Sequence, residues 1–350
     1  MRHLLLAAAL LALPVHADEP VPIPSPGEIA AAAPARDWIA IAPSDLLVMD
    51  LAPDAKGKPR RVVIQLMPPP FSQGWIGNIR KLAAAHWWDG TAVTRVQDNY
   101  VAQWGDPTEK KPLPEGLATL PESEYVTPVK WEQQPDEVVH AYRQRPALAL
   151  LSSEALDGSD PVVPLKVTGK EEWSRNEGYP YRTAFAAGWP VAGQGALNIP
   201  NPSKSLGEPR IWPIHCYGAV GVGRNMSPDT GSGAELYAVI GHAPRHLDRN
   251  IALVGRVISG IEHLSSLPRG TGDLGFYEDA AERVPIVSIR LAADLPAAEQ
   301  PKFEYLSTDS DSFARYADAR ANRRDPFFIT PAGGADICNV PVPIRPVAAK

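Results

Sequence analysis

The stretch from Ala85 to Pro107, AHWWDGTAVTRVQDNYVAQWGDP, combines two strand-like runs with the turn signals that end them. An aromatic pair is followed by Asp89-Gly90-Thr91, and the two runs stop at Asp98-Asn99 and at Gly105-Asp106-Pro107. Asp, Asn and Gly favour turns because their side chains bond the nearby backbone or permit a positive φ. Taken alone, the stretch predicts a hairpin whose cation, Arg95, forms an ion pair with a carboxylate.

The same stretch resembles the signature of cyclophilin-type peptidyl-prolyl isomerases, in which an aromatic pair with DGT precedes HRV, a loop, an aromatic residue and Q-x-GDP. Here the arginine is Arg95, the aromatic residue is Tyr100 and the glutamine is Gln103, and their spacing fits without gaps. The sequence departs from the family pattern where Val93-Thr94 replaces Phe-His and where Asp98-Asn99 replaces Pro-Gly. The resemblance is specific because five features fall in register.

A second block of resemblance lies further along the chain. Gly218 to Arg224 stands where cyclophilins have a glycine-rich strand and loop lining the substrate groove. A phosphate-binding loop is the alternative, and it is disfavoured because no helix start and no Lys-Ser/Thr follow. Ser232 to Val239 resembles the family's S-Q-F-F-I strand, and Leu247 to Val257 its L-D segment ending in G-x-V. The resemblance covers about Asp45 to Pro107 and His215 to Leu291, in family order.

The fold that this resemblance implies is mainly β: an eight-stranded antiparallel barrel closed by two helices, with a packed interior and a substrate groove outside it. Hydrophobic periodicity and possible caps predict elements in a matching order. They are strands at Asp45–Leu51 and Arg61–Met67, a helix at Phe71–His86 with Ser72 as N-cap, a strand at Tyr100–Trp104, a helix at Glu262–Ser266 and a strand at Pro285–Leu291.

Length and proline content shape the predicted domain organisation. The chain has 350 residues, and 38 of them are proline, which breaks helices and central strands. We interpret residues 36–296 as a cyclophilin-like domain interrupted at 108–212 by a long loop-rich insertion. Because the insertion has little periodicity, we expect it to lie over the barrel surface and to be dispensable for the barrel. Residues 297–350 form a C-terminal extension with a helix near Asp309–Arg323.

The N-terminus is typical of a secretory signal peptide, residues 1–17. Arg2-His3 precedes an unbroken Leu/Ala run from Leu4 to Leu13, and Val15-His16-Ala17 supplies small residues at the cleavage positions. The apolar run is too short to span a bilayer, and a buried N-terminal helix is the alternative. Residues 18–35 then read as a Pro/Ala-rich linker. We therefore expect cleavage after Ala17, a periplasmic location and no membrane insertion.

Charge and cysteine content limit the partners. The formal charge is −6 and no Lys/Arg run of the type that binds nucleic acid occurs, so nothing indicates a nucleic-acid partner. Cys216 and Cys338 permit one disulfide in an oxidising compartment, but sequence leaves the pairing open, and two cysteines make no zinc framework. His242 and His246 are four residues apart, but Pro244 argues against a helix that would align them as metal ligands. We expect no metal and no cofactor.

The activity that the resemblance implies is cis/trans isomerisation of X-Pro bonds in proline-containing polypeptides. The barrier, about 18–20 kcal/mol, comes from amide resonance. A fixed cation that donates to the prolyl nitrogen stabilises the twisted transition state more than the ground state. The resemblance gives this role to Arg95, with Gln103 orienting the guanidinium or holding the substrate backbone. The substrate-binding residues that it implies are Tyr100, Val101, Gly223, Arg224, Glu235, Tyr237, His246 and Leu247.

Several of these positions depart from the family. Tyr100 and Tyr237 replace phenylalanines, Glu235 replaces a glutamine and His246 replaces a tryptophan. Strand alternation directs Glu235 and Tyr237 to the groove and Leu236 to the core. Glu235 brings a carboxylate near Arg95, where it either orients or neutralises the guanidinium. The altered pocket leaves a second function open, a catalytically weak cyclophilin-like module for binding or chaperoning.

Overall fold

The computed structural model describes residues 22–128, 182–194, 210–332 and 334–347. The predicted signal peptide and its cleavage site lie outside these ranges, as does most of the predicted insertion. Within the ranges, no helix combines the length and the apolar character that crossing a membrane requires.

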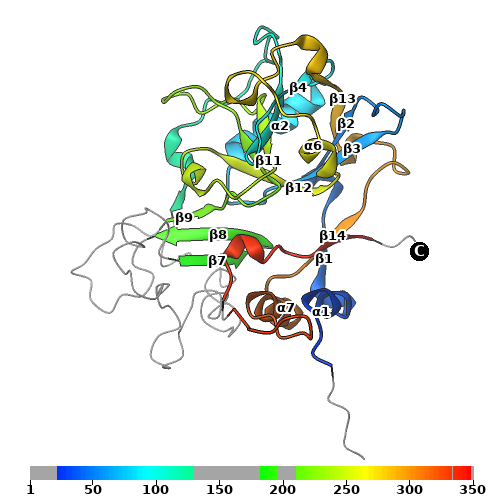
Figure 1. Ribbon diagram of the computed structural model, residues 1–350. Helices are drawn as coiled ribbons and strands as arrows, with labels where there is room; N and C mark the ends of the chain where they lie inside the picture. Colours follow the sequence, from blue (N-terminus) through cyan, green and yellow to red (C-terminus); the bar gives the residue numbers. More distant parts are fainter. Residues whose placement is uncertain (1–21, 129–181, 195–209, 333, 348–350) are drawn as a thin grey trace, which may run out of the picture.

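Eight antiparallel strands close into a barrel in the order β10-β11-β5-β4-β13-β2-β3-β12, which confirms the predicted fold (Figure 1). The strands are β2 (Leu46–Leu51), β3 (Arg60–Leu66), β4 (Ala92–Val96), β5 (Val101–Gly105), β10 (Ala219–Val222), β11 (Leu236–Val239), β12 (Leu253–Ser259) and β13 (Val284–Leu291). Helix α2 (Gln73–Ala84) packs against β12 and β13, and the short α6 (Glu262–Ser265) packs against β3. The barrel interior is filled by apolar side chains, including three almost inaccessible tryptophans, Trp75, Trp88 and Trp104.

Helix α2 illustrates how the sequence pattern becomes packing. Its predicted apolar face, Trp75, Ile79 and Leu82, is completely buried in the barrel core. Ser72 is the N-cap residue, as predicted, but its φ of 52° is left-handed and its hydroxyl makes no capping hydrogen bond. Asn78 is buried as well, and its side chain bonds the backbone of Ala118 in both directions, at 2.8 and 2.7 Å.

The described parts of the predicted insertion form a sheet of their own, in the order β6-β9-β8-β7. Its strands are β6 (Thr127–Pro128), β7 (Arg182–Ala186), β8 (Trp189–Gln194) and β9 (Arg210–Pro213). Leu120, Tyr125 and Trp189 belong to the hydrophobic cluster of the barrel, whereas Phe185 and Trp212 belong to a second cluster. These described residues of the predicted insertion therefore pack into two hydrophobic cores.

The two ends of the described chain pack together. Helix α1 (Pro26–Ala31) lies against α7 (Asp311–Ala321), and a small sheet joins β1 (Trp38–Ala40), β14 (Phe303–Leu306) and β15 (Ile344–Pro346). The short 3-10 turns are η1 (Ala35–Asp37), η2 (Pro43–Asp45), η3 (Glu122–Tyr125), η5 (Arg245–Leu247), η6 (Asp273–Gly275), η7 (Ala280–Glu282), η8 (Ala292–Asp294) and η9 (Ile337–Asn339). Beside η2 and η8, apolar residues of this part, such as Phe303 and Ile344, cover the outer face of β2 and β3.

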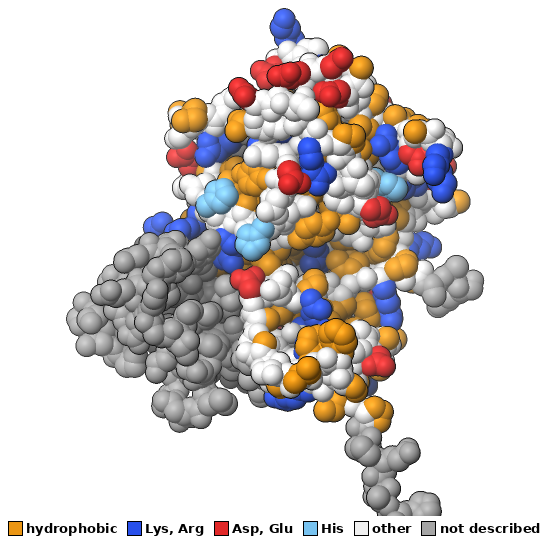
Figure 2. Space-filling model, viewed as in Figure 1, with side chains coloured by type: hydrophobic (Ala, Val, Ile, Leu, Met, Phe, Trp, Pro, Cys, Tyr) orange, Lys and Arg blue, Asp and Glu red, His pale blue; other side chains and the backbone are white. Residues whose placement is uncertain are grey.

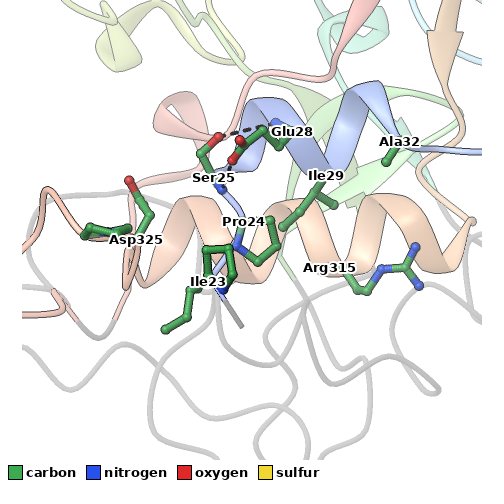
Figure 3. Close-up of a pocket in the computed structure, with 10 residues that line it drawn as sticks. Ile23, Pro24, Ser25, Glu28, Ile29, Ala32, Arg315 and Asp325 are labelled. Carbon is green, nitrogen blue, oxygen red and sulfur yellow. Dashed lines mark hydrogen bonds between the residues drawn. The ribbon is translucent and has the colours of Figure 1, made fainter. Parts of the chain in front are cut away.

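Part of the predicted linker is helical. Residues 26–31 form α1, which begins with a capping box: the backbone N–H of Glu28 donates to Ser25 Oγ at 3.3 Å, and the N–H of Ser25 donates to Glu28 Oε2 at 2.7 Å. Figure 3 shows these residues above α7, beside a hollow that the carboxylate of Asp325 and the side chain of Arg315 also border. The Pro/Ala-rich composition concealed the helix because its residues are individually typical of linkers.

A disulfide ties the C-terminal extension to the barrel. Cys216, just before β10, is bonded to Cys338 in η9, with the Cα atoms 5.1 Å apart. The pairing that the sequence left open is therefore formed, across 122 residues of chain.

Replacing residues 108–208 with a Gly/Ser linker is expected to lower the thermal unfolding midpoint strongly. The replacement removes Leu120, Tyr125, Phe185 and Trp189 from the two cores. Burying each side chain of this kind contributes about 1.5–3 kcal/mol, against a total of about 5–15 kcal/mol for a typical domain. The matched control replaces only residues 130–180, retains the four side chains, and is expected to keep a cooperative transition. A full replacement that unfolds like the wild type would contradict this expectation.

Candidate active site

One row of side chains crosses four strands of the barrel. Arg95 on β4 is paired with Gln103 on β5, Gln103 with Tyr237 on β11, and Tyr237 with Gly221 on β10. Directly opposed residues in antiparallel strands point to the same face of a sheet. The neighbouring residues Trp104 and Leu236 are fully buried in the barrel interior, so the row lies on the outer face.

The guanidinium of Arg95 is fixed by three neutral acceptors. Nη1 donates to Gln103 Oε1 at 3.1 Å, Nη2 donates to Gln97 Oε1, and Nε donates to the carbonyl of Leu274 at 2.7 Å. No carboxylate of the described ranges pairs with it, so the ion pair predicted from the stretch alone is not formed within them. Since arginine carries five N–H donors, each terminal nitrogen keeps one that these bonds leave available. Partial burial lowers the pKa of Arg95 from its ordinary value, which is high enough that the side chain stays charged at neutral pH.

Aromatic rings border the guanidinium. Its carbon lies 5.6 Å from the centre of the Tyr100 ring and 5.3 Å from the centre of the Phe276 ring. The Tyr100 ring also stacks on His246, with the centroids 6.2 Å apart. His246 is exposed and Leu247 is half-buried, both in η5. The structure therefore brings Tyr100, His246 and Leu247 to the same side of the barrel as Arg95.

Glu235 is connected to Arg95 through Gln103. The carboxylate of Glu235 accepts hydrogen bonds from the side chain of Gln103 and from the backbone of Asp106. It lies over Gly105 and fills the space of a Cβ there, which would be 1.8 Å from Glu235 Oε1. Burial raises the pKa of Glu235 to about 7, and these two hydrogen bonds oppose part of the rise. With its carbonyl turned to Arg95 and its amide to Glu235, Gln103 has one defined orientation.

Tyr237 lies on the predicted face but is almost completely buried. Its hydroxyl reaches His215 Nε2 at 3.0 Å, and His215 Nδ1 reaches Asp248 Oδ1 at 2.9 Å. Gly221 makes room for the ring, because a Cβ there would lie 2.3 Å from the tyrosine hydroxyl. Tyr237 therefore forms the fixed floor of the site beside Gln103. Its hydroxyl, which the phenylalanine of the family pattern lacks, is bonded to buried His215.

The remaining predicted residues are placed less directly. Val101 is buried and pairs with Val239, and the backbone N–H of Gly223 donates to the carbonyl of Glu235 at 2.8 Å. Arg224 donates from Nε and Nη2 to the carbonyl of Asn250 at 3.1 and 3.0 Å. Its hydrogen bonds thus tie it to the loop after η5, and none of them joins it to the Arg95 cluster.

Residues 270–276 form a wall of the site that sequence reasoning missed. Phe276 forms an isolated β-bridge with Arg95, and the backbone N–H of Tyr277 donates to the carbonyl of Thr94 at 2.9 Å. Leu274 and Phe276 expose 66% and 40% of their surface, so apolar side chains flank the cation in contact with solvent. The cluster Gly270, Gly272 and Gly275 signals a turn-rich loop, but no local pattern shows that it returns to β4.

The arrangement can bind and polarise without covalent chemistry. It offers a fixed cation with available N–H donors, aromatic and apolar walls, and a glutamine held in one orientation. In the part of the chain that the structure describes, no three His, Cys, Asp or Glu side chains gather as metal ligands.

Comparison with known proteins agrees with this geometry. Residues 75–291, 217 of the 350, match the family model described as cyclophilin type peptidyl-prolyl cis-trans isomerase/CLD. No curated protein sequence matches the chain. The crystal structure of the cyclophilin AquaCyp293 from Hirschia baltica matches 89% of this chain and 94% of its own, with a TM-score of 0.58 and 19% identity.

A more distant structural match is a Cryptosporidium parvum cyclophilin type peptidyl-prolyl cis-trans isomerase crystallised in the presence of the dipeptide Ala-Pro. It is 10% identical and matches 70% of this chain and 98% of its own. Its TM-score of 0.33 is too low to add to the argument.

Proposed function

The chain belongs to the cyclophilin family of peptidyl-prolyl cis-trans isomerases, and we propose that Arg95 is the residue that catalyses isomerisation in it. The substrates of this enzyme class are proline-containing peptides. The observation that carries the proposal is the Arg95 guanidinium, which neutral acceptors hold in place while leaving N–H donors available. A cation without a carboxylate partner in the described ranges retains its full charge for the substrate.

The chemistry follows from the electronic change during rotation. When the X-Pro amide twists, resonance is lost and the prolyl nitrogen gains a lone pair that accepts a hydrogen bond. A donor already fixed at this position favours the twisted state without reorganising during the reaction. Each factor of ten in rate corresponds to about 1.4 kcal/mol of such differential stabilisation. Tyr100, Phe276 and Leu247 supply apolar surface for the proline ring, and Tyr237 supports it from below.

Isomer exchange in a short Ala-Pro peptide, followed by NMR, tests this function directly. We expect the folded protein to accelerate an exchange that otherwise takes tens to hundreds of seconds. Saturable peptide binding with no acceleration would instead support the binding or chaperone module. The altered residues Tyr237 and His246 would then account for the missing catalysis.

Glu235→Gln is expected to flatten the dependence of kcat/KM on pH around neutrality. Because burial raises the pKa of Glu235 to about 7, the wild-type carboxylate forms as the pH rises through that value. The ionised form accepts more strongly from Gln103 and so fixes the amide that holds Arg95. A hydrogen bond worth about 0.5–1.5 kcal/mol corresponds to a change of roughly two- to tenfold.

The same substitution should also change how the stability of the fold depends on pH, with wild type losing stability as the pH rises. A carboxyl group with a raised pKa binds its proton more tightly in the folded state, so its contribution is full below about pH 4.5 and is lost as the pH rises through 7. Glu235→Gln should therefore gain stability relative to wild type between these values. Glu262→Gln is the control, because the Glu262 side chain on α6 is exposed. It should change neither the pH profile of kcat/KM nor that of stability. Parallel pH profiles for wild type and Glu235→Gln would exclude the positioning role of Glu235.

We further propose that the protein is exported to the periplasm and acts on polypeptides there. The charged start and the Leu/Ala run of residues 1–17 support this, and a disulfide is typical of an oxidising compartment. Intact-mass analysis of a periplasmic extract should find a chain beginning at Asp18. A chain that begins at Met1 and fractionates with the cytoplasm would contradict export.

A further inference from the structure

A cavity of about 290 Å³ lies where the barrel, the sheet of the insertion and the C-terminal extension meet. Trp189 and Phe185 line it from the insertion, Leu253 and Arg256 from β12, and Val340 and Val342 from the extension. Figure 2 shows hydrophobic side chains in the region between the barrel and the part of the molecule that holds α1 and α7. The lining includes none of the residues that form the Arg95 site, so the cavity is a separate place on the molecule.

The charge of the lining is one-sided. Among the described residues that line it, Arg256 and Arg320 are the two with a permanently charged side chain, and none is Asp or Glu. Nε and Nη2 of Arg256 donate to Gln65 Oε1 at 3.0 and 2.8 Å, and Nη1 donates to the carbonyl of Gly188 at 2.8 Å. These acceptors are neutral. The guanidinium carbon also lies 4.2 Å from the centre of the Trp189 ring.

Three hydrogen bonds leave one N–H on each terminal nitrogen of Arg256 available. Two such donors can bind both oxygens of a carboxylate in a bidentate pair. Burial lowers the pKa of Arg256 to about 9, so the side chain remains a cation at neutral pH. Arg256 is half-buried. A charge withdrawn from water is costly unless it is paired, and the described part of the chain offers Arg256 no acidic partner.

We propose that this cavity binds a small carboxylate with an apolar body, its head on Arg256 and its body among Trp189, Leu253 and Val342. The volume corresponds to about ten water molecules and lies at the lower end of the range for small-molecule sites, about 300–1,000 Å³. The cavity therefore suits a ligand such as a medium-chain fatty acid. A purely structural role, in which Arg256 ties the turn before β8 to β3, accounts for the three hydrogen bonds but gives the charge no acidic partner among the described residues.

Calorimetric titration of the whole protein with octanoate tests this proposal, with octan-1-ol as the uncharged probe of the same length. We expect saturable octanoate binding and at least tenfold weaker binding of octan-1-ol. Arg256→Met keeps the length and apolar stem of the side chain and should weaken octanoate binding at least tenfold. Arg61→Met, which removes an exposed arginine paired with Asp50 on the barrel, is the matched control and should bind octanoate as the wild type does.

A second variant keeps the test decisive if Arg256→Met does not fold. Val342→Phe leaves Arg256 in place and fills the cavity from the extension, and it should abolish octanoate binding. The proposal is overturned if the folded wild type shows no saturable octanoate binding, if octan-1-ol binds equally well, or if both cavity variants bind as the wild type does. Isomerase activity on a short Ala-Pro peptide is measured separately, because the two sites share no residues.

Discussion

Arg95→Ala is expected to lower kcat/KM for an Ala-Pro peptide by about 100- to 1,000-fold, the loss typical of removing one preorganised donor. The substitution removes the only cation in the row that crosses β4, β5 and β11 in the described structure. Its hydrogen-bond acceptors are the side chains of Gln97 and Gln103 and the backbone carbonyl of exposed Leu274, so the barrel interior stays intact. Thermal unfolding should therefore remain cooperative.

Two further variants separate a positioned donor from simple charge. Arg95→Lys should recover little activity, since an ammonium on a flexible stem does not reproduce a planar fork of donors. Arg269→Ala is the matched control, because Arg269 is also a partly exposed arginine beside the β4–β5 hairpin but pairs with Asp98 at 3.0 Å. We expect it to change kcat/KM by less than about tenfold. Equal rates for wild type and Arg95→Ala, both folded, would reject the catalytic role of Arg95.

Local patterns were sufficient for the elements that bury one face. Trp75, Ile79 and Leu82 repeat at helical spacing, and Val62, Ile64 and Leu66 alternate, so α2 and β3 were predicted close to their observed bounds. The alternation did not predict that Val63 and Gln65, on the other face of β3, would be buried too. Val63 packs against residues of the distant extension and Gln65 is bonded by Arg256 of β12, and no periodicity within a strand indicates such partners.

Some contacts of the candidate site could likewise be predicted from local spacing, and others could not. Arg95 and Gln103 lie on adjacent strands of one hairpin, so their spacing in the chain was enough to predict that they meet. Leu274 bonds Arg95 across 179 residues, and Tyr237 bonds His215, which precedes it by 22. Such contacts are set by closure of the barrel and by loop conformation. For this reason the ion pair expected for Arg95 was replaced by neutral acceptors that no local motif specifies.

The second large effect is expected at Asp248, where substitution by alanine should destabilise the fold by about 3–5 kcal/mol, as breaking a buried charged pair does. Asp248 is 5% exposed. Its Oδ1 accepts from the backbone N–H of His215 at 3.0 Å and contacts His215 Nδ1 at 2.9 Å, while its Oδ2 accepts from Arg245 Nε at 2.7 Å. The alanine leaves His215 and Arg245 without these acceptors in a region where water does not replace them.

The pH dependence of stability tests whether the charge of Asp248 causes the loss in Asp248→Ala. Burial alone would raise the pKa of Asp248, but the hydrogen bond and charge of His215 and the charge of Arg245 lower it below its ordinary 3.8. A carboxylate with a lowered pKa stabilises the folded state above about pH 4, and this contribution is lost as the pH falls through its folded value. The deficit of Asp248→Ala in urea unfolding should therefore be full at pH 7 and shrink below pH 4.

Asp248 also supports the site, because His215 connects it to Tyr237 beneath Gln103 and because it directly follows Leu247. Asp248→Ala should consequently lower kcat as well, at temperatures where the protein is still folded. Asp50→Ala is the control: Asp50 pairs with Arg61 at 2.8 Å at the surface, with 32% of its side chain exposed, and should cost less than about 1 kcal/mol. If Asp248→Ala proves as mild as Asp50→Ala, the buried network neither stabilises the barrel nor holds the floor of the site.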